Sequence, residues 1–468
     1  MGSEFPPQSL NEMLSFKVTP SILTPRLGNL AIAGRKAIST PHYIPSSSRG
    51  IVPHISHDVM RDHTAIGSLF VGLEDFVERQ NLKEQLPPAY TIPTTQGESA
   101  LRKFISLPDD LLLVMGARRE PPIQCPPSNT PNSVAIYTAV GFRQLEAPQY
   151  IDAVRSLNPD IVVGLADLVL GHTPGVKRRG KMVDRTHAFT THATEQLYGT
   201  AENRSKTAYF APVLPLDNAQ QSIYMDDLED ELRPYVSGLA LYESASLSAI
   251  SEPLGDLPRL LFSGPKTPHD VLRDVSLGAD LLTIPFIAVC SDAGIALDFT
   301  FSANTTTTNR QPMAYDLWSS SYITDTSTLS ESCQCYTCRN HHRAYIHHLL
   351  SAKEMLAWTL LQIHNHHTMD TFFSQIRESI ARNTFEANVQ AFQRAYVSEL
   401  PEPTGQGPRL RGYQLPASGA NQPRRFPRVY GRLDDAVERF TESQSSVATP
   451  DTGADGLEEH GFARKEKS

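Results

Sequence analysis

Short apolar runs rich in β-branched residues alternate with amphipathic segments through the middle of the chain. The segments QYIDAVRSL, VDRTHAFTTHATEQL and PHDVLRDVSLG repeat apolar residues at helical spacing, and Gly, Pro and Asn separate them from the runs. Strands and helices in this alternation form βα units around a parallel sheet. The predicted strands cover Ser133–Tyr137, Ile161–Asp167, Tyr209–Leu214, Ser237–Glu243, Arg259–Gly264 and Leu281–Phe286.

This repetition of βα units favours an α/β fold of the (β/α)8 TIM-barrel type, with a doubly wound sheet as the alternative. A chain of 468 residues with 40% hydrophobic residues can bury the core that such a fold needs. We expect residues 1–132 to form N-terminal strands and the first barrel units, and residues 133–301 to form the main barrel units.

The C-terminal part of the chain departs from this pattern. Residues 302–332 are rich in Thr and Ser without clear periodicity, which predicts a flexible excursion. Residues 333–400 are expected to hold an inserted zinc-binding subdomain and C-terminal helices. Residues 401–468 offer too little apolar surface to offset the entropy of ordering, so a mostly disordered tail is predicted.

Three of the five cysteines lie close together, as Cys333, Cys335 and Cys338. This arrangement does not suit a disulfide framework, and it is typical of a metal site in a reducing compartment. One histidine would complete a tetrahedral, structural Zn²⁺ site. Cys125 and Cys290 are isolated and are interpreted as ordinary thiols.

The completing histidine has to be chosen from a His-rich segment. Short spacing favours His341 or His342, but apolar residues recur at helical spacing from Ile346 to Ile363. His364 lies about five turns after Ile346 at 3.6 residues per turn, so it is predicted to end the buried face. We therefore predict His364 as the fourth ligand and the neighbouring histidines as polar surface residues.

The metal segment and the strands before it resemble the tRNA-guanine (queuine) transglycosylase family. The run CQCYTCRNHHRAYIHHLLSAKEMLAWTLLQIHN is similar to that family's zinc segment, including the spacing from Cys338 to His364. Upstream, SGLALYE and PRLLFSGPKTPHD resemble the family's GGLxVGE and PRxLxGxGxPxD motifs. The resemblance extends from Ala135 to Ile380 and implies a (β/α)8 barrel with a zinc subdomain. It also implies exchange of guanine in a tRNA anticodon for queuine or its precursor.

Such an exchange breaks an N-glycosidic bond, which needs a carboxylate at C1′ and an acid–base group for the departing base. The resemblance places the nucleophile at Thr283, where catalytic members carry Asp, and the second acid at Thr138. A third, base-reading Asp is retained as Asp167, and Asp280 matches a structural Asp of the motif.

Loss of both acids beside a complete set of metal ligands makes the chain resemble the non-catalytic accessory subunit of the heterodimeric eukaryotic enzyme. Residues Gly294–Phe301 also look like that subunit's GxALxFxF motif. The implied partners are tRNA and a catalytic queuine tRNA-ribosyltransferase subunit, docked on the side that carries the zinc insert. The implied role is partner stabilisation and tRNA positioning during exchange at the wobble position. A carboxylate brought to position 283 from another segment would overturn this interpretation.

The formal net charge of −9 restricts any contact with nucleic acid to local basic patches. Lys177, Arg178, Arg179 and Lys181 form one candidate RNA-binding patch, which the solvated start of a helix also explains. A flexible linker likewise explains the second candidate, in the tail. It comprises Arg409, Arg411, Arg424, Arg425, Arg428 and Arg432, with Tyr413, Phe426 and Tyr430 between them.

Two other functions fit the same residues. A catalytically active transglycosylase would need a displaced carboxylate such as Asp280, Asp292 or Asp298. A zinc-dependent RNA-binding scaffold would bind RNA without base exchange. The sequence has no uninterrupted apolar run of about 18 residues and no basic, apolar leader, so we expect a cytoplasmic protein without a membrane span. The resemblance adds peripheral attachment at the mitochondrial outer membrane.

Overall fold

The computed structural model describes residues 14–18, 25–77, 87–95, 97–125, 128–138, 141–199, 204–302 and 310–408. Eight parallel strands form one sheet in the order β4-β13-β12-β11-β10-β9-β6-β5. They are β4 (His42–Ile44), β5 (Ser68–Gly72), β6 (Leu112–Gly116), β9 (Ile161–Val163), β10 (Ala208–Val213), β11 (Gly238–Leu241), β12 (Arg259–Leu261) and β13 (Leu281–Thr283).

Backbone hydrogen bonds join the two ends of this sheet. The Phe70 amide in β5 donates to the Pro45 carbonyl at 3.0 Å, and the Ser47 amide donates to the Phe70 carbonyl at 3.2 Å. The sheet therefore closes on itself, which confirms the (β/α)8 barrel and excludes the doubly wound alternative.

Alternate side chains of each strand divide the core into two parts. Leu112 and Val114 of β6 belong to one buried cluster with Phe210 and Leu260, whereas Leu113 and Met115 belong to a second cluster. Because successive strand residues point to opposite faces, the first cluster fills the barrel and the second packs against the helices.

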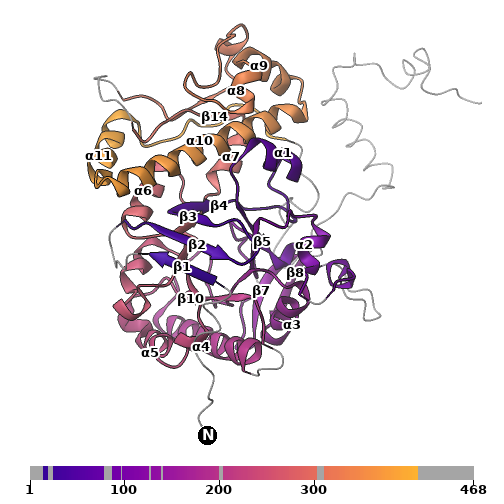
Figure 1. Ribbon diagram of the computed structural model, residues 1–468, viewed down its shortest axis with the longest axis vertical. Helices are drawn as coiled ribbons and strands as arrows, with labels where there is room; N and C mark the ends of the chain where they lie inside the picture. The colour runs from indigo at the N-terminus through magenta and orange to yellow at the C-terminus, as the bar shows by residue number, and fades with distance from the viewer. Residues whose placement is uncertain are drawn as a thin grey trace, which may run out of the picture.

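Helices surround the barrel (Figure 1). They are α1 (His57–His63), α2 (Ala100–Phe104), α3 (Ala147–Leu157), α4 (Val176–Tyr198), α5 (Asn218–Glu229), α6 (Pro268–Ser276) and α7 (Phe286–Ala293). The three amphipathic segments singled out in the sequence lie in α3, α4 and α6. Local signals set the helix starts: α6 begins after a capping box in which Thr267 and Asp270 satisfy each other's backbone amides.

One predicted barrel strand was wrong. Residues 133–137 lie in β7 (Ser133–Thr138), which pairs antiparallel with β8 (Gly141–Glu146) outside the barrel sheet. All six residues of β7 are buried, so the run reads like a central strand. Its partner, however, is the next strand along the chain, which begins at Gly141, a glycine with a φ of 111° that pairs with Thr138.

A small antiparallel sheet covers one end of the barrel. It consists of β1 (Leu14–Val18), β2 (Gly28–Ile32) and β3 (Ile38–Thr40). Leu14, Leu30 and Ile38 belong to the same cluster as the side chains that fill the barrel. The sheet therefore closes the end at which the parallel strands begin and leaves the opposite end for a functional site.

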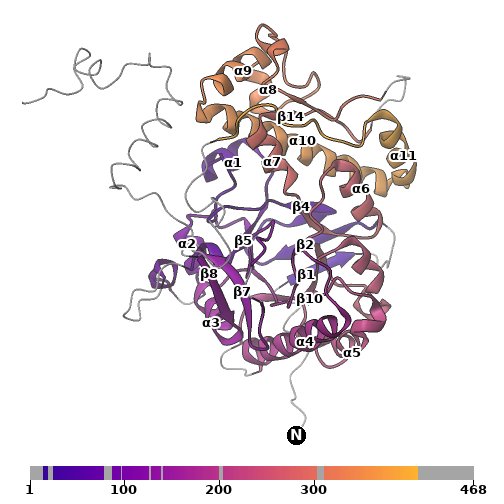
Figure 2. The same ribbon diagram turned by 180° about the vertical axis from the view of Figure 1, so that it is seen from behind.

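A C-terminal module lies at one end of the molecule, and its helix α10 runs along the side that faces the barrel (Figures 1 and 2). It comprises β14 (Ile295–Leu297), β15 (Ala314–Asp316), α8 (Tyr336–Asn340), α9 (Arg343–Ser351), α10 (Met355–Ala381) and α11 (Phe385–Ala395). Tyr43 in β4 anchors α10, because its hydroxyl donates to Asp370 Oδ1 at 2.9 Å. Arg377 adds a hydrogen bond to the Pro41 carbonyl at 2.9 Å.

Two sequence predictions need correction in this module. Residues 310–332 of the predicted excursion contain β15, and Leu317 and Leu329 are fully buried, so this part is more structured than predicted. The helical pattern from Ile346 spans two helices, because the chain turns at Lys353 with a φ of 55° before α10 begins. Among the described residues, no helix combines the length and the apolar character of a membrane span.

Candidate metal centre and barrel mouth

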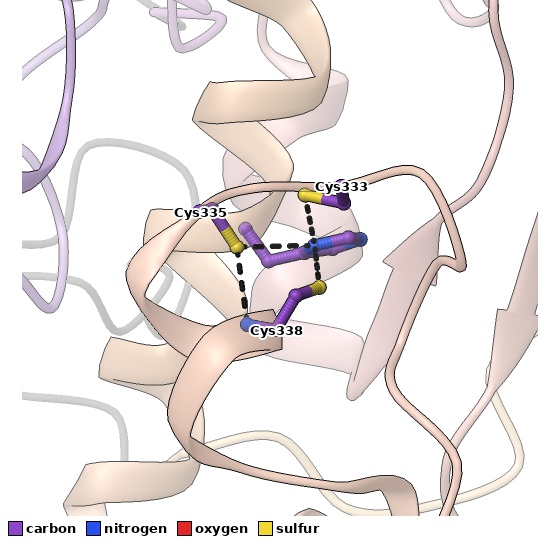
Figure 3. Close-up of side chains that lie close together, drawn as sticks. Cys333, Cys335 and Cys338 are labelled. Atoms are coloured by element: carbon purple, nitrogen blue, oxygen red, sulfur yellow. Dashed lines mark hydrogen bonds between the residues drawn. The ribbon is translucent and has the colours of Figure 1, made fainter.

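The four predicted metal ligands converge on one point between α8 and α10 (Figure 3). Cys333 lies in the turn before α8, Cys335 is the N-cap of that helix, Cys338 lies within it, and His364 projects from α10. The three sulfur atoms lie 3.6, 3.6 and 3.4 Å from His364 Nδ1. All four candidate ligand atoms lie within 4.8 Å of one another.

These distances fit a tetrahedral metal ion. With metal–sulfur bonds of about 2.3 Å and metal–nitrogen bonds of about 2.0–2.1 Å, tetrahedral geometry separates sulfur from nitrogen by about 3.6 Å. The other ring nitrogen, His364 Nε2, lies 2.8 Å from the Leu297 carbonyl. Donation to that carbonyl leaves Nδ1 with its lone pair toward the sulfurs, so β14 orients the ligand. The site can therefore hold a metal ion.

The sequence argument for His364 reached the right residue by a wrong route. His364 does not end a buried face, because α10 continues past it and buries Met369, Phe372 and Ile376. His366, predicted to lie at the surface, is only 2% exposed and contacts Tyr43.

The two positions at which the family resemblance predicts acids carry hydroxyls, in different surroundings. Thr283 ends β13 and is fully buried at the end of the barrel where the strands terminate, hereafter the mouth. Thr138 ends β7 in the hairpin outside the barrel, where its hydroxyl donates to the Gly141 carbonyl at 2.8 Å.

Asp167, which the resemblance predicts to read the base, is bound by arginines. Arg178 forms two hydrogen bonds with its carboxylate, at 2.6 and 2.5 Å, and Arg185 adds a third at 3.1 Å. Asn129 donates to the same carboxylate at 2.6 Å. The negative charge of Asp167 is therefore paired within the protein. Because Arg178 makes this pair, it is not free to contact RNA as part of the predicted RNA-binding patch.

The rest of that patch lies at the start of α4. Lys177 and Lys181 are exposed, one helical turn apart, whereas Arg179 is half-buried and hydrogen-bonded to Gln220 at 3.4 Å. The second basic patch, from Arg409 to Arg432, lies outside the described residues.

The three carboxylates suggested as displaced nucleophiles do not reach Thr283. Asp280 precedes β13 at the opposite end of the barrel, where it pairs with Arg26 in a fully buried ion pair. Asp292 on α7 pairs with His54 at 2.5 Å. Asp298 follows β14 in the C-terminal module, and its amide donates to the Met313 carbonyl at 2.8 Å.

The carboxyl group of Glu120, which the sequence reasoning missed, does reach Thr283. Glu120 hydrogen-bonds with Thr283, and its half-buried side chain lies between two cavities of about 230 and 320 Å³. Burial raises the pKa of Glu120 to about 8, against the smaller opposing effect of the Thr283 hydrogen bond. Its position four residues beyond β6 was the available signal, because residues that follow barrel strands line the mouth.

The chain was compared with known proteins. The model of the family described as queuine tRNA-ribosyltransferase matches residues 22–398. The chain belongs to this family. The match confirms the resemblance noted in the metal segment and extends it over the whole barrel.

Several curated relatives carry one name. The chain is 33% identical over 383 residues to queuine tRNA-ribosyltransferase accessory subunit 2 of Schizosaccharomyces pombe, covering 81% of this chain and 83% of that protein. Proteins of the same name from Culex quinquefasciatus and Xenopus tropicalis are 27% and 28% identical. These two alignments cover 78% and 76% of this chain and 87% and 92% of the relatives.

Proposed function

We propose that this chain is the non-catalytic accessory subunit of a heterodimeric tRNA-guanine (queuine) transglycosylase. In this role it stabilises a catalytic partner and positions tRNA while guanine at the wobble position is exchanged for queuine. One observation carries the proposal: Cys333, Cys335, Cys338 and His364 lie together as a possible metal site, while Thr283 and Thr138 carry hydroxyls where the family resemblance predicts acids. The names of the relatives support the same role.

Glu120 does not restore the missing nucleophile in this account. Breaking an N-glycosidic bond develops positive charge on the ribose, so the attacking or stabilising group has to be an anion. A carboxyl whose pKa is raised to about 8 is largely protonated at neutral pH. The second candidate, an active transglycosylase with a displaced carboxylate, therefore depends on Glu120 losing its proton.

Zn²⁺ is the metal that best suits three thiolates and one imidazole. When bound, it would supply four bonds and no vacant position, so its contribution is to fold stability. Cys333, Cys335, Cys338 and His364 would hold the turn before α8 against α10. The ion would thereby fix the shape of the surface that the C-terminal module presents.

That surface is the proposed docking face for the catalytic partner. Among the described residues, nine large apolar side chains are exposed, and five of them lie between α7 and α10. Exposed apolar side chains are a common feature of protein interfaces, so these five are the candidates for partner contact. The five are Val289, Ile323, Tyr336, Met355 and Leu356, with exposures of 62%, 57%, 40%, 55% and 43%.

The test is the mass of the full chain in solution with and without a catalytic transglycosylase subunit, measured by light scattering after size exclusion. We expect a one-to-one complex with the wild-type chain and none with Met355→Glu/Leu356→Glu. Ile223→Glu is the matched control, because Ile223 is 73% exposed on α5, at the opposite end of the molecule (Figure 1). A mass that never exceeds that of the separate chains would contradict the proposal and favour an RNA-binding scaffold.

Positioning of tRNA is assigned to Lys177 and Lys181, the exposed cations at the start of α4. Lys177→Glu/Lys181→Glu should weaken tRNA binding by the complex and lower the slope of log affinity against log salt by about one per lost phosphate contact. Lys206→Glu is the control, since Lys206 is exposed beside β10 at the end where the strands begin. An unchanged salt slope would remove these lysines from the tRNA-binding surface.

A further inference from the structure

The larger of the two cavities at the mouth, of about 320 Å³, lies between the segment after β4, α7 and α10. Its walls are mainly apolar, and Ile284, Pro285 and Ile287 contribute much of them. Neither Thr138 nor Asp167 lines it, so it is separate from the base-reading position assigned by family resemblance. Small-molecule sites commonly have volumes of about 300–1,000 Å³, so this cavity suits one or two fused rings.

A chain of hydrogen bonds fixes the orientation of one amide in the cavity wall. Tyr43 donates its proton to Asp370 Oδ1, so its oxygen accepts from His366 Nδ1 at 3.0 Å. His366 Nε2 is then an acceptor, and Gln362 Nε2 donates to it at 3.0 Å. The amide of Gln362 is thereby oriented with its Nε2 occupied and its Oε1 left as a pure acceptor.

That acceptor has no protein partner. Gln362 is 1% exposed and lines the cavity, yet its Oε1 has no hydrogen bond within the described residues. Ser46 lines the same cavity, and its buried Oγ also lacks one in this part of the chain. Leaving a buried polar atom unsatisfied costs about 1–3 kcal/mol. Two such atoms in one cavity therefore point to a bound molecule that satisfies them.

The charges around the cavity are already paired or neutral. Arg119 is bound by Glu74 at 2.8 Å and by Asp75 at 3.0 Å. Asp292 is paired with His54, and burial raises the pKa of Glu120 to about 8, which keeps that carboxyl mainly uncharged at neutral pH. A charged ligand would lose its hydration here without gaining a counter-ion. The cavity therefore favours a neutral molecule.

We propose that this cavity binds a neutral, flat heterocycle whose ring N–H donates to Gln362 Oε1 and whose polar ring atom bonds to Ser46 Oγ. Lactam-type rings such as the purine base guanine have this combination of donor and acceptor on one edge. The choice of guanine as the probe rests on the proposed function, in which guanine is the base released from tRNA. Glu120 forms the boundary between this cavity and the neighbouring one of about 230 Å³, so a bound ring would lie beside the mouth.

The test is equilibrium dialysis of the full chain against radiolabelled guanine. The wild-type chain should bind one guanine saturably, and Gln362→Met should weaken binding about tenfold, as expected for loss of one buried hydrogen bond. Gln390→Met, at an exposed position on α11, is the matched control and should bind like the wild type. Urate, a purine that is an anion at neutral pH, should bind at least about tenfold more weakly than guanine because it carries charge into the cavity.

Ala288→Phe on α7 provides an independent variant, because it fills the cavity without touching the hydrogen-bond chain to Asp370. It should abolish guanine binding while circular dichroism and metal content stay unchanged. No saturable binding by the wild-type chain, or binding that survives both cavity variants, would overturn the proposal. Complex formation with the catalytic subunit is measured on the same samples, so failure of the ligand site and failure of the accessory role give different results.

Discussion

The metal centre and the barrel mouth are both built where helices pack against strand ends, but their polar side chains are arranged in opposite ways. At the metal centre, three sulfurs and one ring nitrogen converge on a common point, and the surrounding backbone orients them toward it. At the mouth, Asp167 is bound by two arginines, and Glu120, whose pKa is raised by burial, hydrogen-bonds with Thr283. Convergent donors need a ligand from outside the chain, whereas the carboxylates of the mouth are satisfied within it.

Whether a polar side chain is already paired within the protein is therefore a better guide to its role than its residue type. Asp167 and Asp280 are aspartates that the sequence put forward for base reading and for displaced catalysis, yet both lie in internal ion pairs. Thr283, a residue without a charge, is buried at the position that the resemblance predicts for the nucleophile. The following predictions test whether each region has the role that its geometry indicates.

The largest effect is expected at the metal centre. Cys335→Ser should remove the bound metal and lower the free energy of unfolding on the order of 5 kcal/mol, because metal-binding free energy becomes folding free energy. Complex formation with the catalytic partner should be lost with it. Cys125→Ser, at an isolated half-buried thiol, should change neither metal content nor stability by a comparable amount. Elemental analysis and urea unfolding provide the measurements, and a variant that keeps its metal would refute the ligand assignment.

The next largest effect is expected at Asp280. Asp280→Asn leaves Arg26 without its buried partner and should cost about 3–5 kcal/mol of unfolding free energy. Asp256→Asn breaks an exposed ion pair with Arg233 and should cost at most about 1 kcal/mol. Guanine exchange by the complex should fall only with the folded fraction. A fully stable Asp280→Asn chain that gives an inactive complex would indicate a chemical role.

A smaller effect is expected at Asp167. Asp167→Asn leaves Arg178 and Arg185, both partly exposed, with weaker partners and should cost about 1–3 kcal/mol in urea unfolding. Arg178→Met is the matched change, because it removes the arginine that donates to Asp167 and leaves the aspartate in place. Loss of exchange by the complex without any loss of stability would instead make Asp167 a base-reading residue.

The smallest effect is a pH dependence at Glu120. In the folded chain its pKa is raised from 4.5 to about 8, so the folded state holds a proton that the unfolded state releases between these values. Wild-type stability should therefore decrease as pH rises through this window, and Glu120→Gln should remove that contribution. The variant should match the wild type near pH 5 and be more stable than it near pH 8. The full shift corresponds to about 5 kcal/mol, of which we expect on the order of 1 kcal/mol because solvent screens the half-buried side chain. Parallel pH profiles would mean that Glu120 is ionised in the folded chain and available as an anion.

The sequence predicted the parts of the fold that depend on local pattern. Apolar runs identified five of the eight barrel strands, because a buried parallel strand reads as a continuous β-branched run. β7 was misassigned for the same reason, since its six buried residues do not reveal that its partner is the adjacent β8. The cluster of three cysteines was predictable because C-x-C-x₂-C spacing is typical of a metal site, whereas that spacing did not identify His364.

What the sequence could not supply were contacts between distant segments. Glu120 meets Thr283, and Tyr43 meets His366, only because barrel closure brings residues far apart in the chain together. Such a contact also distinguishes Arg178 from Lys177. The two basic residues are adjacent in the sequence, but only Arg178 is hydrogen-bonded to Asp167 in the folded chain. Pairing of charges is a property of the folded surface, which local sequence does not encode.

The most direct test of the central claim is exchange of labelled guanine into tRNA, measured for the purified chain alone, for a catalytic subunit alone and for the two together. The account predicts no turnover by this chain alone and greater turnover by the mixture than by the catalytic subunit alone. Sustained exchange by the purified chain alone, abolished by Glu120→Gln, would contradict it.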